Sequence, residues 1–346
     1  MKSNWEEKMI VYMKPGATEE EIGRVTARIE QFGNRHDVSR GDQVMIGIKG
    51  PTQKIDEGYF AELPGVERVF RISKKWKEVS REYHQRNTVI DVNGVKIGEG
   101  LVVIAGPCTV ESREQTSETA RMVKAYGANM LRGGAWKPRT STYEFQGLGE
   151  EGLEYLALAK EVTGLPIVTE IMGAEMIPLF EKYGVDIYQV GARSCQNFQL
   201  LKELSGINKP VLLKRGLAVT IDEYLCAAEY LHAGNGSNSG NKNVILCERG
   251  IRTFETATRN TADVNAIAWI KRYSHLPIIG DPSHATGLRE LVPDISRAMV
   301  AAGADGLIIE AHFAPENALV DGQQSVRDEL EGIIKKCKEI YELVHK

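Results

Sequence analysis

Residues 101–137, LVVIAGPCTVESREQTSETARMVKAYGANMLRGGAWK, contain one strand-and-helix unit and the strand that starts the next. A short apolar run at 102–105 is followed by a polar segment of helical length and a second apolar run at 130–131. Short apolar runs that alternate with amphipathic helices are typical of a parallel sheet covered by helices. This stretch therefore predicts an α/β fold.

The same alternation continues toward the C-terminus. Eight apolar runs, each followed by a helical segment, occupy residues 102–105, 130–131, 167–170, 187–190, 211–214, 244–248, 278–281 and 307–310. Eight parallel strands in about 245 residues favour a (β/α)8 TIM barrel over a doubly wound sheet, and no GxGxxG follows the first run. In such a barrel the active site lies at the carboxyl ends of the strands.

The first 73 residues follow another pattern. Strand-like runs are expected at 9–13, 36–39, 44–48 and 66–72, with helices after the capping box of Thr18 and Glu21 and at 55–63. The order βαββαβ predicts a small α+β ferredoxin-like domain. It has no clustered nucleophile, base or metal ligand, so we expect a regulatory or structural role.

These patterns predict three parts. A ferredoxin-like regulatory domain covers residues 1–73, a charged linker covers 74–86, and the catalytic barrel covers 87–346 and begins with a hairpin at Asn93 and Gly94. The insertion at 234–242 precedes the sixth strand and is expected to be a surface loop.

Composition excludes several classes of protein. The chain has 346 residues, a net charge of -4 and no basic block, which argues against nucleic-acid partners and against a membrane-surface helix. No long apolar run and no secretory signal is present, so we expect a cytoplasmic location. Five irregularly spaced cysteines predict free thiols.

Cations concentrate at the predicted strand ends. They are Arg132, Lys137, Arg139, Arg193, Lys214, Arg215, Arg249 and Arg252. Like charges gathered in one cleft imply a strongly anionic ligand, most simply phosphates and a carboxylate. The alternative is that some of them form structural ion pairs with Glu170, Glu248 and Asp281.

A second set offers metal ligands. Cys108, His284, Glu310 and Asp321 follow the first, seventh and eighth strands, and His312 is a competing ligand. Thiolate, imidazole and carboxylates suit Mn²⁺, Fe²⁺, Zn²⁺ or Co²⁺ without selecting among them. Packed core residues are the alternative.

Nine motifs, taken together, carry a resemblance over residues 87–340. They are IAGPC, LRGGAWKPRTS, QGLGEEGL, VTEIM, QVGAR, VLLKRG, ILCERGIRTFETATRNT, DPSHATG and DGQQS. The barrel resembles the 3-deoxy-D-arabino-heptulosonate-7-phosphate (DAHP) synthases, and the first domain resembles the ferredoxin-like regulatory domain of one subgroup. The resemblance implies condensation of phosphoenolpyruvate (PEP) with erythrose 4-phosphate, the first step of the shikimate pathway, with a divalent metal, most simply Mn²⁺.

Residue roles follow from the motif positions. The resemblance assigns PEP to Arg132, Lys137, Arg193, Lys214 and Arg249, erythrose 4-phosphate to Pro138, Arg139, Thr140 and Ser141, and the metal to Cys108, His284, Glu310 and Asp321. Lys137, Cys108 and His284 are the expected catalytic residues, with Lys137 delivering a proton because neighbouring arginines should depress its pKa. A tyrosine or phenylalanine effector and a homotetramer are also implied.

Two rival functions remain open. One is 3-deoxy-manno-octulosonate-8-phosphate synthase, which uses arabinose 5-phosphate and typically has a KANRSS-like loop where this chain has KPRTS. The other is a non-catalytic metabolite sensor with a degenerate barrel, whose mark would be a lost ligand or cation.

Overall fold

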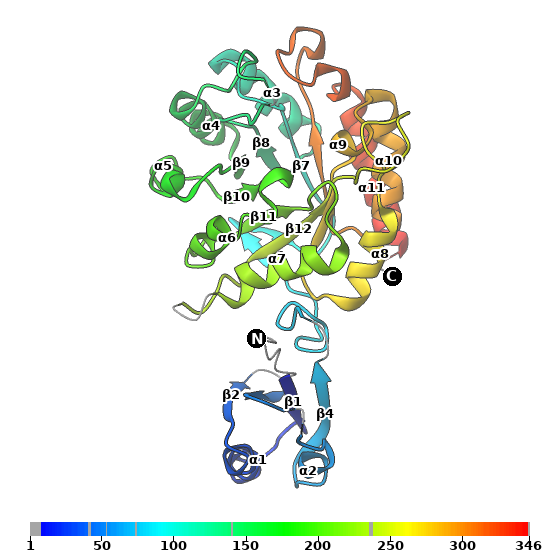
Figure 1. Ribbon diagram of the computed structural model, residues 1–346. Coiled ribbons are helices and arrows are strands. Elements are labelled where there is room, and N and C mark those ends of the chain that lie inside the picture. Colours follow the sequence, from blue (N-terminus) through cyan, green and yellow to red (C-terminus); the bar gives the residue numbers. More distant parts are fainter. Residues whose placement is uncertain are drawn as a thin grey trace. The chain divides into compact units, whose positions relative to one another are not determined.

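The computed structural model of the chain describes residues 8–40, 43–52, 54–72, 75–139, 141–234 and 238–344. The chain divides into two compact units, Met1–Lys77 and Glu78–Lys346 (Figure 1). Thr140, two residues of the expected linker boundary (73 and 74) and part of the 234–242 insertion lie outside the described residues.

The N-terminal unit is a four-stranded antiparallel sheet with two helices. Its elements are β1 (Lys8–Met13), α1 (Glu19–Gln31), β2 (Arg35–Arg40), β3 (Val44–Lys49), α2 (Gly58–Ala61) and β4 (Val66–Ile72). The strand order β2-β3-β1-β4 is that of a ferredoxin-like sheet, so the predicted fold of this unit is confirmed.

Local sequence signals explain the ends of these helices. The side chain of Thr18 accepts a hydrogen bond from the backbone of Glu21, whose carboxylate binds the Thr18 backbone in return, and this capping box starts α1. The second helix, expected at 55–63, is only one turn long, because a turn at Ile55 and the Asp56 side chain on the Gly58 N–H delay its start. One apolar face of α1 packs with β1 and β3 in a single core.

The second unit contains a two-stranded hairpin and a closed parallel barrel. The hairpin is β5 (Ile90–Val92) and β6 (Val95–Ile97). The barrel strands are β7 (Val102–Gly106), β8 (Met130–Arg132), β9 (Ile167–Glu170), β10 (Ile187–Val190), β11 (Val211–Lys214), β12 (Val244–Glu248), β13 (Ile278–Gly280) and β14 (Gly306–Glu310). Each strand pairs with the next in sequence, and β14 pairs with β7, with Ile308 opposite Ile104. The predicted (β/α)8 barrel is confirmed.

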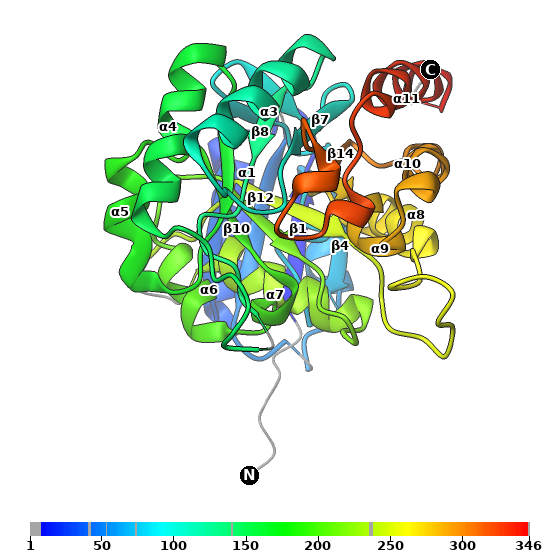
Figure 2. The same ribbon diagram turned by 90° about the horizontal axis from the view of Figure 1, so that it is seen from above.

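Helices surround the barrel (Figure 2). They are α3 (Arg113–Ala125), α4 (Glu150–Thr163), α5 (Ile177–Lys182), α6 (Phe198–Leu204), α7 (Ile221–Ala233), α8 (Val264–Tyr273), α9 (Pro282–Thr286), α10 (Val292–Ala301) and α11 (Glu329–Val344). No helix within the described ranges is long and apolar enough to cross a membrane. All five cysteines are free, as expected.

The hairpin closes the amino-terminal end of the barrel. Asn93 and Gly94 both have positive φ, which gives the turn geometry that tight hairpins prefer. The hairpin residues Ile90, Val92 and Ile97 join one apolar cluster with inward-facing strand residues such as Ile104 and Ile308. The barrel interior is therefore a packed core at this end, and a ligand site is expected at the other end.

Polar side chains at the amino-terminal end bind strand backbones. Asn129, Asp186 and Asp305 accept from the backbone N–H groups of residues 103, 167 and 278, each at 2.8 Å. The two aspartates also pair with lysines, Asp186 with Lys160 and Asp305 with Lys271, both at 2.7 Å. Both of these buried aspartates therefore have their charge partners within the protein.

Candidate active site

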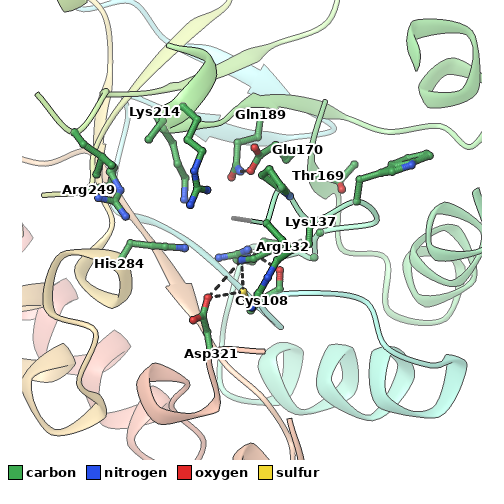
Figure 3. A pocket seen from close by; sticks show the side chains of 18 of the residues that line it. Cys108, Arg132, Lys137, Thr169, Glu170, Gln189, Lys214, Arg249, His284 and Asp321 are labelled. Carbon is green, nitrogen blue, oxygen red and sulfur yellow. Dashed lines mark hydrogen bonds and ion pairs between the residues drawn. The ribbon is translucent and has the colours of Figure 1, made fainter. Parts of the chain in front are cut away.

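The opposite end of the barrel carries a polar cavity of about 380 Å³ (Figure 3). Arg132, Glu170 and Lys214 are the last residues of β8, β9 and β11, and their side chains line it. Because all eight strands are parallel, their carboxyl ends meet at this face. The lining contains eight Lys and Arg side chains but only three carboxylates, those of Glu144, Glu170 and Asp321.

Three of the expected metal ligands lie together beside the cavity, and two of them, Cys108 and Asp321, line it. Donor atoms of Cys108, Glu310 and Asp321 are all within 4.8 Å of one another, and the Cys108 Sγ lies 3.1 Å from Asp321 Oδ2. The His284 Nε2 is 3.2 Å from Glu310 Oε1, so the fourth expected ligand adjoins the same group. One thiol, one imidazole and two carboxylates form a donor set that suits a divalent transition metal.

Backbone geometry places these ligands. A Cβ at Gly106 would overlap the carbonyl oxygen of Arg132, so only glycine allows β7 to approach β8 here, just before Cys108. Asp321 adopts the left-handed conformation with φ of 54°, which Asp tolerates better than most residues. Asp281 caps α9, and its Oδ2 lies 2.8 Å from His284 Nδ1, which orients the Nε2 toward Glu310.

The charge states of the ligands follow from burial and neighbours. Burial alone would raise the pKa of Glu310, but His284, Arg132 and Lys137 together lower it to about 2. Burial lowers the pKa of His284 to about 4 despite Asp281 and Glu310. At neutral pH the pair therefore presents a carboxylate and a neutral imidazole, the forms that bind metals. Burial, with Glu310 nearby, raises the pKa of the Cys108 thiol.

Lys137 differs from expectation. Its Nζ lies 2.7 Å from Cys108 Sγ and 3.4 Å from Asp321 Oδ2. Burial lowers the pKa of Lys137, yet Cys108, Glu310 and Asp321 together outweigh burial and raise it. The predicted depression of this pKa is wrong, because the nearest groups are acidic ligands and not arginines.

Several cavity cations have carboxylate partners. Arg132 pairs with Glu310 at 2.9 Å, and Lys214 pairs with Asp281 at 2.6 Å. Arg139 pairs with Glu144 at 2.6 Å. The alternative of structural ion pairs therefore holds for part of the predicted cationic set.

Other cavity cations have no such partner. Within the described part of the chain, Arg193, Arg249 and Arg252 have no carboxylate at ion-pair distance, and all three line the cavity. Arg249 is only 5% exposed, and its one protein hydrogen bond is to the Gly250 carbonyl at 3.3 Å. Burial lowers the pKa of Arg249, and the more distant Asp281 offsets only part of this effect, so the charged form is incompletely compensated among the described residues.

Two predicted residues lie elsewhere. Arg215 does not line the cavity: its guanidinium binds Glu248 and Asp263, both at 2.8 Å, because consecutive residues at a strand end point to opposite sides. His312 is outside the ligand group; its Nδ1 accepts from the Ala314 backbone and its Nε2 faces Glu111 at 3.9 Å. The chain turns after β14, so strand alternation does not extend to His312.

The predicted aldose loop is only partly at the cavity. Pro138 and Arg139 line it, whereas Ser141 is not among the described lining residues and Thr140 lies outside the described residues. Ser141 accepts from the backbone of Tyr143 at 3.3 Å.

Several lining residues were given no role from the sequence. Those with polar side chains include Trp136, Glu144, Thr169, Gln189, Arg259 and Asn260, and Glu170 was considered only as a partner in a structural ion pair. Glu170 and Gln189 lie opposite each other near the carboxyl ends of β9 and β10, and Gln189 Nε2 donates to Glu170 at 3.1 Å. Their positions in these strands were the sequence signal that could have identified them. Arg259 lies eleven residues beyond β12 in a loop, where strand periodicity gives no signal.

Comparison with known proteins agrees with this geometry. A model of the DAHP synthetase I family matches residues 82–346, which is most of the chain. The chain belongs to the DAHP synthetase I family. A model of the DAHP synthase ferredoxin-like domain matches residues 9–74. The predicted family, and its subgroup with an N-terminal ferredoxin-like domain, are confirmed.

Individual relatives of this family support the assignment. The chain is 51% identical over 324 residues to a phospho-2-dehydro-3-deoxyheptonate aldolase of Thermotoga maritima, covering 93% of this chain and 94% of that protein. A crystal structure of the Thermotoga maritima enzyme, DAHP synthase, aligns with a TM-score of 0.73 at 48% identity and 98% coverage of both chains. A 2-dehydro-3-deoxyphosphooctonate aldolase of a Geobacter species is 33% identical, covering 74% of this chain and 98% of that protein. DAHP synthases are metal-dependent enzymes that form C–C bonds, and the Cys108 group is the candidate ligand set for this chain.

Proposed function

We propose that this protein condenses PEP with erythrose 4-phosphate to give DAHP and phosphate, the first step of the shikimate pathway. The supporting observation is that Arg193, Arg249 and Arg252 line the cavity without a carboxylate at ion-pair distance among the described residues, and that Arg249 is buried there. Two phosphates and a carboxylate supply the missing negative charge. A degenerate sensor would have lost a ligand or a cation, and this chain retains every one in its sequence.

The cations divide between two substrates. Arg132, Lys137, Arg193, Lys214 and Arg249 would hold the PEP phosphate and carboxylate. Pro138, Arg139, Thr140 and Ser141 would hold the phosphate of erythrose 4-phosphate, with Arg139 released from Glu144 when that phosphate binds. The exposed Arg139–Glu144 pair contributes little stability, so the exchange costs little.

The reaction joins C3 of PEP to the aldehyde carbon. Water then adds at C2, and the resulting hemiketal phosphate loses phosphate by C–O cleavage. Lys137 is protonated in this site, so it would donate to the aldehyde oxygen as negative charge develops there. The arginines stabilise the leaving phosphate. A divalent ion, Mn²⁺ first among the candidates, held by Cys108, His284, Glu310 and Asp321, would add Lewis-acid polarisation of the aldehyde oxygen.

The N-terminal unit would serve regulation. Its fold carries no catalytic cluster among the described residues, which favours binding of an effector, tyrosine or phenylalanine, over chemistry. We further propose a cytoplasmic homotetramer as the working form.

Phosphate release by Mn²⁺-loaded protein tests the proposal. PEP is supplied with erythrose 4-phosphate or with arabinose 5-phosphate, each with and without chelator and with tyrosine or phenylalanine. Chelator-sensitive release with erythrose 4-phosphate alone supports the proposal, and inhibition by an aromatic amino acid supports the regulatory role. Release with arabinose 5-phosphate alone would favour the octulosonate reaction of the Geobacter relative, and release with neither sugar would favour a sensor.

A further inference from the structure

Gln324 is a fully buried amide beside the candidate metal ligands. It ends the 3-10 turn η5 (Gly322–Gln324), three residues after Asp321, and its side chain has no exposed area. The Gln324 backbone N–H donates to the Asp321 carbonyl at 3.2 Å, and the Ser325 hydroxyl donates to the same oxygen at 3.1 Å. The turn that positions Asp321 therefore also positions the Gln324 amide.

Both the nitrogen and the oxygen of the Gln324 side-chain amide form hydrogen bonds. Its Nε2 donates to Glu310 Oε2 at 2.5 Å, and its Oε1 accepts from the Arg259 guanidinium at 3.0 Å. The reverse orientation would face an oxygen toward a carboxylate and an NH₂ toward a guanidinium, which neither partner can satisfy. The two partners thus select one orientation.

The contact with Glu310 fixes the rotation of its carboxylate. The other oxygen, Oε1, faces Arg132 at 2.9 Å and His284 Nε2 at 3.2 Å. Because Gln324 holds Oε2, the two oxygens cannot exchange places without breaking a buried hydrogen bond. Glu310 also donates its backbone N–H to the Ser283 hydroxyl at 2.9 Å.

The contact with Arg259 orients a partly exposed side chain that lines the cavity. Arg259 is 40% exposed at its side chain, and a free arginine of this kind samples many rotamers. Its guanidinium also lies 3.4 Å from Asp321 Oδ1. Gln324 and Asp321 together hold the guanidinium at the cavity wall.

We propose that Gln324 is a positioning residue that links the ligand Glu310 to the cavity cation Arg259. Gln324 does not line the cavity, so it acts through these two residues. The expected effect of Gln324 on the KM of the substrates rests on the function proposed above, whereas its expected effect on metal affinity does not. Neighbours that hold metal ligands commonly change metal affinity by about 10–100-fold when they are replaced.

The tandem glutamines of this turn provide a matched pair of variants. Q324M removes both side-chain hydrogen bonds of Gln324 and keeps the side-chain length. Q323M replaces the exposed neighbouring glutamine with the same residue and serves as the control. Affinity for Mn²⁺ alone is measured by the electron paramagnetic resonance signal of free Mn²⁺. We expect Q324M to weaken Mn²⁺ binding by about 10–100-fold and Q323M to leave it unchanged.

Steady-state kinetics at saturating Mn²⁺ separate the two contacts. We expect Q324M to raise the KM of a phosphorylated substrate more than it lowers kcat. In an R259M background, adding Q324M should still weaken Mn²⁺ binding but should raise KM no further, because its partner is already absent.

The comparison of Q324M with Q323M decides the inference, and weaker Mn²⁺ binding by Q324M alone supports it. Equal Mn²⁺ affinities of folded Q324M and Q323M would overturn it. If Q324M does not fold, as judged by circular dichroism, Q324N takes its place, since an asparagine is one methylene too short to reach both partners and should weaken Mn²⁺ binding likewise. If the wild type binds Mn²⁺ but releases no phosphate, the proposed function fails while the Mn²⁺ comparison still decides the role of Gln324.

Discussion

The two ends of the barrel differ in whether their buried charges have partners of opposite charge within the protein. At the amino-terminal end, Asp186 and Asp305 each have a lysine and a backbone N–H as partners. At the carboxyl end, lining cations outnumber lining carboxylates, and Arg249 is buried without a carboxylate at ion-pair distance among the described residues. Charge that is compensated within the protein contributes to the fold, whereas uncompensated charge beside a cavity indicates a ligand.

Arg215 offers the strongest way to sharpen this comparison, because it lies at the carboxyl end but is fully paired. R215M would leave Glu248 buried without its cation and Asp263 without an ion pair. We expect a loss of about 3–5 kcal/mol in the free energy of unfolding, measured by denaturant titration. R252M, at an exposed arginine, is the control and should change it by less than about 0.5 kcal/mol. Equal stabilities would mean that Arg215 is not a structural cation.

Lys137 should affect turnover. K137M removes a protonated donor next to Cys108 and Asp321, so we expect kcat to fall by about 10²–10³-fold with folding preserved. The measurement is phosphate release under PEP saturation. A variant that loses affinity for substrate but keeps its turnover would contradict a role in proton donation.

Arg249 should affect binding and not folding. R249M removes a buried charge that has no carboxylate at ion-pair distance among the described residues, so the thermal midpoint should not fall, while the KM for PEP should rise by about 10–100-fold through loss of charged hydrogen bonds. A calorimetric melt and a PEP titration test both parts. A large fall in stability with unchanged KM would place Arg249 with the structural charges.

His275 predicts acid sensitivity of the amino-terminal end. Its Nε2 donates to the Glu78 carbonyl and its Nδ1 accepts from Thr88, both at 2.7 Å, and burial lowers its pKa to about 3. An unfolded histidine gains its proton near pH 6.5, so stability should fall as pH drops from 6.5 toward 3, by about 2 kcal/mol between pH 7 and 5.

Denaturant titrations at pH 7 and pH 5 test this, with H275Q as the comparison. Glutamine keeps two hydrogen-bonding ends but does not titrate, so the variant should lose this part of the acid sensitivity. An equal fall in wild type and H275Q would assign the sensitivity to other buried histidines, such as His284, whose pKa burial lowers to about 4. Glu78 does not contribute in this range, because its pKa of about 2 places its contribution below about pH 4.5.

Sequence patterns predicted the features that depend on residues close together in the chain. The eight strands, the capping box of Thr18 and the strand-end position of Lys214 follow from periodicity and short motifs, and the structure agrees. The pairing of Arg215 and the raised pKa of Lys137 depend on which groups lie across the barrel, and strand periodicity does not contain that information. Arg259 and Gln324 act from loops, where three-dimensional contacts alone reveal their neighbours.

The pairing of β14 with β7 also sets the order in which the site can form. These neighbouring strands are some two hundred residues apart in sequence, so bringing them together closes a long loop late in folding. During synthesis from the N-terminus, a growing chain that has not yet reached β14 carries Cys108 but neither Glu310 nor Asp321. Because Glu310 is the last residue of β14 and Asp321 lies beyond it, the ligand cluster cannot be complete before the barrel closes.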